Sequence, residues 1–359
     1  MPAEYYKYVI YGWVLLLTLI AGVKISSVKS EFGVSKMDIK ILLVPLFLLF
    51  FIFFIGFRPI HPIFGDTGVY ARLYHDPTMF EDDWLFGWFQ RFCSQRFDIS
   101  TFFFLITIGY IVPIWISCKK LIKNNSDVLI IFYIGALIFY GSAVNGIRNG
   151  LACSIFLLAL AFLSDEKKTK LPFWLLAIIA IGIHKSTFLP VFCAVFANYY
   201  RRFNLMFYVW CASIVLSLIA GSSIGAYLGS LGFDDRMAQY TDMELMEQYK
   251  SIFSSTGFRW DFLLYSFMPI LLGWYTIYKR HIIDNTYFIL LATYIYANSF
   301  WILVIYSINS NRFANLSWFL YPIVLGYPLL KYPIFKNNHN TKTALILIGQ
   351  LFFTLLLGF

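Results

Sequence analysis

The sequence predicts an all-α fold, a polytopic membrane helix bundle of about 11–12 transmembrane helices, some of them short or re-entrant. Of the 359 residues, 60% are hydrophobic and only 13% are charged, and the mean hydropathy is +0.70. A soluble fold cannot bury that much apolar surface. The charged residues stand in short clusters between apolar stretches, as in a chain that crosses a bilayer repeatedly.

Twelve apolar stretches are candidates for these helices, and they form a single integral membrane domain over residues 1–359. They run at about 8–23, 40–57, 99–118, 128–144, 147–164, 171–183, 186–200, 204–221, 260–278, 286–306, 313–331 and 343–358. Several are shorter than the roughly 20 residues that a perpendicular membrane helix needs. We therefore expect some helices to be short or re-entrant.

The segment 171–200 admits two interpretations, one long tilted helix or a tight hairpin interrupted at His184-Lys185. An even number of crossings keeps Arg201-Arg202 and the later basic clusters on the same side as Lys119-Lys120. Because basic clusters mark cytoplasmic loops, we expect the hairpin, and both chain termini then face outward.

Two long loops, at about 58–98 and 222–259, fall on the outer side in this topology. Both interleave aromatic and charged side chains, and loops of such length in a compact protein are usually functional. We expect them to fold as short helices over the outer face.

The predicted topology separates lysine from arginine. The cytoplasmic side receives fourteen Lys and three Arg, whereas the outer side receives three Lys and eight Arg. Lysine excess on one side is the ordinary cytoplasmic signal, but that rule does not explain arginine on the opposite side. Since guanidinium grips phosphate through two parallel hydrogen bonds, the outer arginines indicate a site for a phosphate-bearing ligand.

The first candidate group follows the second apolar stretch and contains Arg58, Asp66 and Tyr70. Asp66 and Tyr70 are four residues apart and would share one face of a helix. Asp66 is a candidate proton acceptor, although a helix N-cap explains it equally well.

The second candidate group is Asn145-Gly146-Ile147-Arg148-Asn149-Gly150, inside an otherwise apolar region. A charge there is costly unless it faces a cavity, and the two glycines would permit close approach of a backbone or a ligand. The alternative is an outer turn from which Arg148 reaches the lipid headgroups.

Further candidates stand at other outer helix ends. His184 could accept a proton near neutral pH, or it could be a packing residue, and Lys185 follows it directly. Arg236, Arg259 and Arg312 lie at or near the ends of later helices. The histidines and the five cysteines show no metal-ligand spacing, so we expect no metal and no cofactor. The distribution of basic residues also argues against nucleic acid as a partner.

The ordered set of these motifs resembles the EpsG-type polysaccharide polymerases, relatives of the Wzy O-antigen polymerases. The matching elements are Arg58 with Gly65-Asp66 and Tyr70, Gly146-Ile147-Arg148 with Ala152, Ile183-His184-Lys185-Ser186, and Arg312. The first loop departs from the family pattern, because it carries Glu81-Asp82-Asp83-Trp84 where an acidic residue followed by proline is common in relatives.

The resemblance implies an inverting, GT-C-like membrane glycosyltransferase at the outer face of a bacterial cytoplasmic membrane. It would transfer a growing glycan from undecaprenyl pyrophosphate to the terminal sugar hydroxyl of an incoming lipid-linked unit. The candidate catalytic residues are His184, Asp66 and Arg148. The candidate substrate-binding residues are Arg58, Arg148, Arg312, Arg259, Arg236, Tyr70 and Lys185. Membrane lipid is a partner, and a chain-length regulator is a further partner that the resemblance allows.

Three alternatives remain at this point: a flippase of lipid-linked oligosaccharides, a membrane O-acyltransferase, and an O-antigen ligase. A transporter usually shows internal repeats and ionisable groups at the bilayer midplane. In this sequence the ionisable groups cluster at the outer helix ends, which favours the polymerase.

Overall fold

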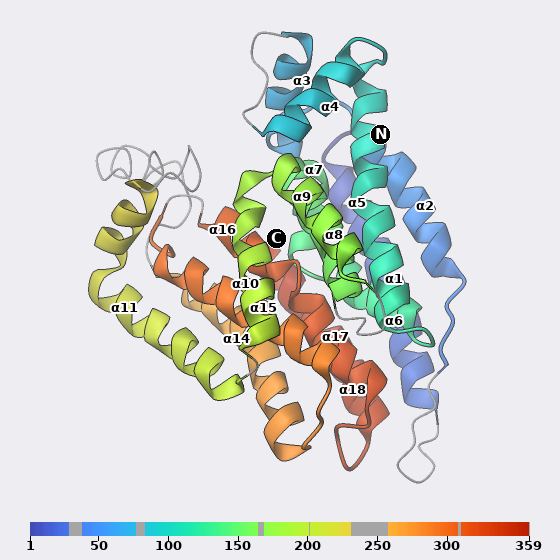
Figure 1. Ribbon diagram of the computed structural model, residues 1–359. Coiled ribbons are helices and arrows are strands. Elements are labelled where there is room, and N and C mark those ends of the chain that lie inside the picture. Colours follow the sequence, from blue (N-terminus) through green and yellow to red (C-terminus); the bar gives the residue numbers. More distant parts are fainter. Residues whose placement is uncertain are drawn as a thin grey trace. The chain divides into compact units, whose positions relative to one another are not determined.

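The computed structural model describes residues 1–28, 38–76, 83–163, 169–200, 202–230, 258–307 and 310–358. Every regular element in these ranges is helical, and Figure 1 shows their order along the chain. The chain forms two compact units, unit 1 with residues 1–184 and 325–359 and unit 2 with residues 185–324. Each unit is described by itself.

The predicted all-α polytopic bundle is confirmed, since each of the twelve apolar stretches forms helix. Unit 1 holds α1 (Tyr5–Ser27), α2 (Leu43–Gly56), α5 (Ile99–Leu121), α6 (Ser126–Ile134), α7 (Ile138–Val144), α8 (Ile147–Leu163), α9 (Leu171–Ile183) and α18 (His339–Gly358). Unit 2 holds α10 (Phe188–Tyr199), α11 (Phe203–Ser230), α14 (Trp260–Trp274), a π-helical turn (Tyr275–Lys279), α15 (Asn285–Leu303) and α16 (Asn311–Trp318). Helix α17 (Tyr321–Lys331) contains a boundary between the units.

Not all of these helices are long enough to cross a bilayer alone. In the described residues six helices have the length and apolar composition of a membrane span, or seven if α6 and α7 count as one. Helices α2, α8 and α9 are apolar but shorter. The predicted total of about 11–12 therefore includes helices too short to span perpendicularly, as the sequence indicated.

The break predicted at His184-Lys185 is confirmed. Helix α9 ends at Ile183, His184 has an extended backbone (φ −151°, ψ 109°), and a short 3-10 turn at Lys185–Thr187 precedes α10. A single continuous helix over 171–200 is thereby excluded. The side chain of His184 consequently lies at a helix end and not along a helix face.

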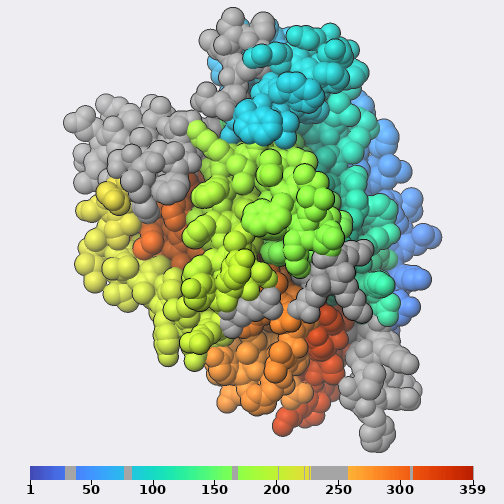
Figure 2. Space-filling model, viewed as in Figure 1, coloured from blue at the N-terminus to red at the C-terminus, as the bar shows by residue number. Residues whose placement is uncertain are grey.

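The first predicted outer loop contains the expected short helices, α3 (Thr67–His75) and α4 (Trp84–Ser94), with a 3-10 turn at Pro62–Phe64. Helix α4 contacts α3, α5 and α9, and its atoms lie directly beside those of α9 in Figure 2. The second predicted loop begins later than expected, because α11 continues to Ser230 past a non-helical Ala220. Residues 231–257 of that loop lie outside the described residues.

Helices α6 and α7 form a broken pair whose axes differ by 70°. A break leaves backbone carbonyls without helical partners, and in a membrane other groups must supply those bonds. Two side chains of α18 do so: Gln350 Nε2 donates to the carbonyl of Phe132 (2.6 Å), and Thr354 Oγ1 donates to that of Gly135 (2.8 Å). The C-terminal helix therefore stabilises the bend that leads into α8.

Unit 2 is held together by a buried polar network. Asn298 on α15 accepts a hydrogen bond from Trp210 Nε1 (2.9 Å) and donates to Ser266 (3.2 Å) and Ser317 (3.1 Å). The Trp318 indole also donates to Ser266 (2.8 Å). Helices α11, α14, α15 and α16 are thus joined through hydrogen bonds that lipid cannot replace.

Candidate active site

The carboxylate of Asp83 joins two of the predicted site residues. Its Oδ2 atom accepts a hydrogen bond from Arg148 Nη1 at 2.8 Å and lies 3.2 Å from His184 Nδ1. Asp83 precedes α4, Arg148 lies in the first turn of α8, and His184 follows α9. All three residues are buried, with exposed fractions of 5% for Asp83, 5% for Arg148 and 9% for His184.

Two aromatic residues complete the surroundings of the Arg148 guanidinium. Its Nε donates to the hydroxyl of Tyr70 at 3.1 Å. The rings of Tyr70 and Phe86 lie 5.9 and 5.8 Å from its central carbon, within the range of cation–π attraction. Arg148 and Tyr70, which the sequence marked as separate candidates, are therefore in direct contact.

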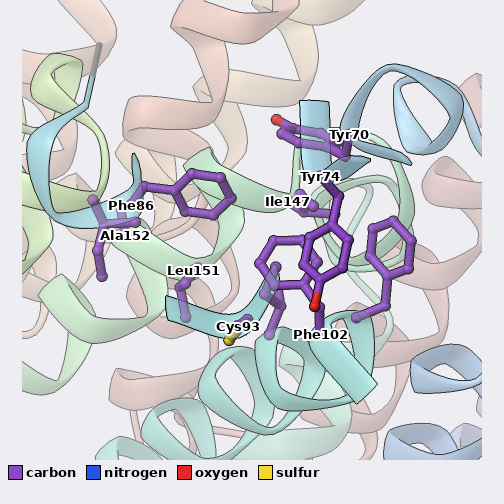
Figure 3. Close-up of a cluster of buried hydrophobic side chains, with 11 residues drawn as sticks. Tyr70, Tyr74, Phe86, Cys93, Phe102, Ile147, Leu151 and Ala152 are labelled. Atoms are coloured by element: carbon purple, nitrogen blue, oxygen red, sulfur yellow. The ribbon is translucent and has the colours of Figure 1, made fainter. Parts of the chain in front are cut away.

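An apolar cluster fixes the helices that carry these residues. Its members are Tyr70, Tyr74, Phe86, Cys93, Phe102, Phe103, Ile106, Ile147, Leu151, Ala152 and Ile183. Ile147 directly precedes Arg148, and Ile183 directly precedes His184. In Figure 3 the hydroxyls of Tyr70 and Tyr74 point in different directions, and the Tyr74 hydroxyl donates to the Phe97 carbonyl at 2.9 Å. Close packing leaves the polar groups little freedom to move.

The turn before α3 is tied to the turn before α8. The backbone N–H of Asp66 donates to Asn145 Oδ1 at 2.9 Å, and Thr67 Oγ1 donates to the Val144 carbonyl at 3.0 Å. Gly65 has a positive φ of 61°, and a Cβ there would lie 2.2 Å from Asn145 Oδ1, so only glycine fits. Asp66 occupies the N-cap position of α3, yet its side chain makes no capping hydrogen bond. The N-cap explanation of this carboxylate is therefore wrong.

Arg58 follows the C-terminal end of α2 and is also buried. Its guanidinium donates to the Ile55 carbonyl (3.0 Å) and to Thr67 Oγ1 (3.3 Å), and it lies 4.5 Å from the centre of the Phe103 ring. Burial lowers the pKa of Arg58 to about 10, with Tyr140 opposing the shift. The group therefore keeps its positive charge at neutral pH.

The arrangement around Asp83 has a defined chemical consequence. When Nδ1 of His184 carries the proton, it donates to Asp83, and Nε2 is then the basic nitrogen. A proton taken up at Nε2 creates an imidazolium whose charge the Asp83 carboxylate stabilises, as in the catalytic triads of hydrolases. Arg148 balances the carboxylate charge, which a buried acid requires. In that tautomer the ring of His184 could accept a proton at Nε2.

Three other predicted residues belong to unit 2. Arg259 forms a bidentate pair with Asp261 (2.9 and 2.6 Å) and lies 3.7 Å from the centre of the Phe262 ring. Arg312 is the second residue of α16, and Lys185 begins the 3-10 turn before α10. Arg236 lies outside the described residues. The structure thus brings Tyr70, Arg148 and His184 together in unit 1, while convergence with Arg58, Asp66, Arg259 and Arg312 remains a prediction.

Asp83 is the site residue that sequence reasoning missed. It stood in an acidic run that differs from the family pattern, and nothing in the run singled out its third acid. Asp83 could have been found from its position directly before the apolar and aromatic residues of α4. An acid beside a buried helix face needs a cation to compensate its charge. No group of three or more His, Cys, Asp or Glu suited to a metal ion occurs in the described part of the chain.

Gly182 permits α4 to approach α9 closely enough for Asp83 to reach His184. A Cβ at Gly182 would lie 2.7 Å from the Trp84 ring and 3.0 Å from Leu85 Cβ. Gly182→Ala is therefore expected to destabilise the protein by about 1–3 kcal/mol through overpacking, measured as a lower thermal midpoint in one detergent. Gly146→Ala is the matched control, since a Cβ there meets nothing within 4 Å. Equal midpoints for both variants would contradict the tight contact.

The fold and the site together define a multi-pass helical membrane protein with a buried Arg–Asp–His group at its helix ends. The EpsG family matches residues 41–359, and the chain belongs to this family. Family membership indicates a membrane polysaccharide polymerase that acts on lipid-linked saccharides. No match is found among curated proteins or among solved structures.

Proposed function

We propose that the protein polymerises lipid-linked oligosaccharide repeat units at the outer face of a bacterial cytoplasmic membrane. The acceptor is the terminal sugar hydroxyl of an incoming lipid-linked unit. The donor is the growing glycan on undecaprenyl pyrophosphate. The bond that forms joins the acceptor oxygen to the anomeric carbon, and the bond that breaks joins that carbon to pyrophosphate. A single displacement of this kind inverts the anomeric configuration.

The observation that carries the proposal is the buried contact of Asp83 with both His184 and Arg148. His184 takes the proton of the acceptor hydroxyl at Nε2, and Asp83 orients the ring and stabilises the imidazolium. The displaced lipid pyrophosphate gains negative charge, and preoriented cations lower the free energy of that charge in the transition state. Arg58 and Arg148 supply this positive charge in unit 1.

The remaining predicted residues have secondary roles in this proposal. Tyr70 holds Arg148 in place through its hydroxyl. Lys185, Arg312 and Arg236 would bind the glycan or the second pyrophosphate. Arg259 is the weakest member, because the Asp261 carboxylate already accepts hydrogen bonds from Nε and Nη2 along one edge of its guanidinium.

The charged ends of the helices support the proposed orientation. The inner ends of α5 and α9 carry or adjoin lysines, Lys119 and Lys120 on α5 and Lys170 before α9. Lysines near span ends favour the cytoplasmic side. The opposite ends of the same bundle carry Arg58, Arg148 and His184, which supports an outward-facing site.

Reconstitution with natural substrate tests the proposal. A host strain that lacks the gene should accumulate single lipid-linked units, and the lipids extracted from it supply donor and acceptor. Purified protein in liposomes with these lipids should produce a ladder of glycans spaced by one repeat unit. Heat-treated protein is the control.

Each alternative predicts a different product from the same lipids. A flippase moves single units across the bilayer without extending them, an acyltransferase adds an acyl group, and a ligase transfers glycan only when a separate acceptor is added. If correctly folded protein in these liposomes leaves the single units unextended, the proposal is contradicted.

A further inference from the structure

Helix α4 of unit 1 carries a continuous aromatic stripe on its exposed side. The exposed residues of this helix are Trp84, Trp88, Arg91 and Phe92. Their spacing of three or four positions places them on one side of a helix, and the buried residues of α4 lie on the opposite side. Trp84 is 64% exposed and Trp88 is 60% exposed. Contiguous exposed apolar groups of this size mark a surface that binds a partner.

Arginine extends the stripe past the end of the helix. The rings of Trp88 and Phe92 are stacked with their centres 5.6 Å apart. The Arg96 guanidinium carbon lies 4.2 Å from the centre of the Phe92 ring, and Phe97 beyond it is exposed. Helix α4 contains no acidic residue. The exposed side of α4 is therefore aromatic and cationic.

The stripe is continuous with the lipid-facing side of α9. A Cβ at Gly182 of α9 would lie 2.7 Å from the Trp84 ring, so Trp84 packs against the end of that helix. On the same side of α9, at intervals of three or four positions, Leu171, Leu175 and Ile178 are exposed. Helix α9 is one of the apolar helices of the membrane bundle, and these side chains meet acyl chains. The surface of α4 begins where that of α9 ends (Figure 2).

Two partners suit an aromatic surface, a sugar ring and the headgroup region of a bilayer. Sugar hydroxyls donate hydrogen bonds as well as accept them, and carboxylates are strong acceptors, which α4 lacks. Tryptophan is enriched at membrane–water interfaces, and helices that lie in the interface combine aromatic with basic side chains. Composition and continuity with α9 therefore favour the bilayer.

We propose that α4 lies in the outer headgroup region of the bilayer, with Trp84, Trp88 and Phe92 against the upper acyl chains and Arg96 at the lipid phosphates. The partner is a phospholipid surface, and this contact does not depend on the proposed function. It has a consequence for that function, because Asp83 directly precedes Trp84 along the chain. Anchoring α4 in the interface holds Asp83 near the level of the headgroups. A lipid-borne pyrophosphate would then approach Asp83, Arg148 and His184 without leaving that level.

A nitroxide attached at position 88 tests the placement. In liposomes, collisions of the nitroxide with oxygen increase toward the acyl chains, whereas collisions with a water-soluble nickel chelate increase toward the aqueous phase. The references are Ile178→Cys on α9 for the acyl region and Ile283→Cys for water, since Ile283 is 94% exposed before α15. Labelled Trp88→Cys should give an oxygen-to-nickel ratio between the two references. A ratio equal to that at position 283 would overturn the inference.

Labelling at Gln95 repeats the measurement with all the aromatic rings in place. Gln95 is exposed at the C-terminal end of α4, and labelled Gln95→Cys should also give an intermediate ratio. Wild-type protein treated with the label measures the background from the native cysteines, most of which are buried. A ratio at position 95 equal to that in water would overturn the inference. Loss of nickel collisions on adding oligosaccharide released from the lipid-linked units would then identify a sugar-binding surface. Neither measurement uses polymerase activity, so the inference can fail while the proposed function holds.

Discussion

Alanine at position 184 is expected to slow polymerisation about a hundredfold or more, which is the usual loss when a positioned general base is removed. The side chain is buried, and its Nδ1 lies 3.2 Å from Asp83. We therefore expect no other group to replace it as the base. Binding of the lipid-linked donor should change little, because the imidazole acts on the acceptor hydroxyl. Initial rates and donor KM, measured on the extracted lipids in liposomes, separate the effect on turnover from the effect on donor binding.

Two aspartate variants serve as controls for the His184 prediction. Asp66→Asn removes a carboxylate that does not cap α3, and it should leave turnover near the wild-type rate if His184 is the base. Asp83→Asn should lower kcat with little change in donor KM, since Asp83 is a positioning residue for His184. If Asp66→Asn abolishes turnover while the His184 variant retains it, the two proposed roles are reversed.

The helical membrane fold could be predicted because hydrophobic runs and charged clusters report directly on burial in lipid. All twelve stretches became helices, and the break at His184 was found from the charges on either side of it. The 70° bend between α6 and α7 was not predicted. Its carbonyls are satisfied by Gln350 and Thr354 from a distant helix, and such tertiary bonds leave no local pattern.

The sequence singled out Arg148 and His184 as candidates but not Asp83, the acid that contacts both. Charge cost inside a bilayer marks Arg148 as unusual wherever its partner lies. Asp83 is separated from Arg148 by 65 positions and from His184 by 101, so only the packing of α4 on α9 brings them together. Arg58 is also buried, against Phe103 and Thr67, and its contact with substrate stays a prediction.

Replacement of Arg148 by lysine is expected to lower activity about tenfold to a hundredfold at unchanged expression. The guanidinium divides its donors between Asp83 (2.8 Å) and the Tyr70 hydroxyl (3.1 Å), and a single ammonium cannot reproduce that divided geometry. A hydrogen bond to a charged group contributes roughly 1.5–3 kcal/mol, which corresponds to that loss of rate. Full activity in Arg148→Lys would leave the residue only a structural role at the start of α8.

Removal of the Arg148 charge should lower the stability of the protein as well as its rate of polymerisation. Arg148→Met leaves the Asp83 carboxylate buried without its guanidinium, and breaking a buried pair in this way costs about 3–5 kcal/mol. The double variant Arg148→Met with Asp83→Asn removes both charges and should regain much of that loss, seen as a higher thermal midpoint than the single Arg148→Met variant in the same detergent. Its activity should remain low, because His184 would then lack the carboxylate that orients it. If the double variant is no more stable than the single one, Asp83 is not the charge that Arg148 neutralises.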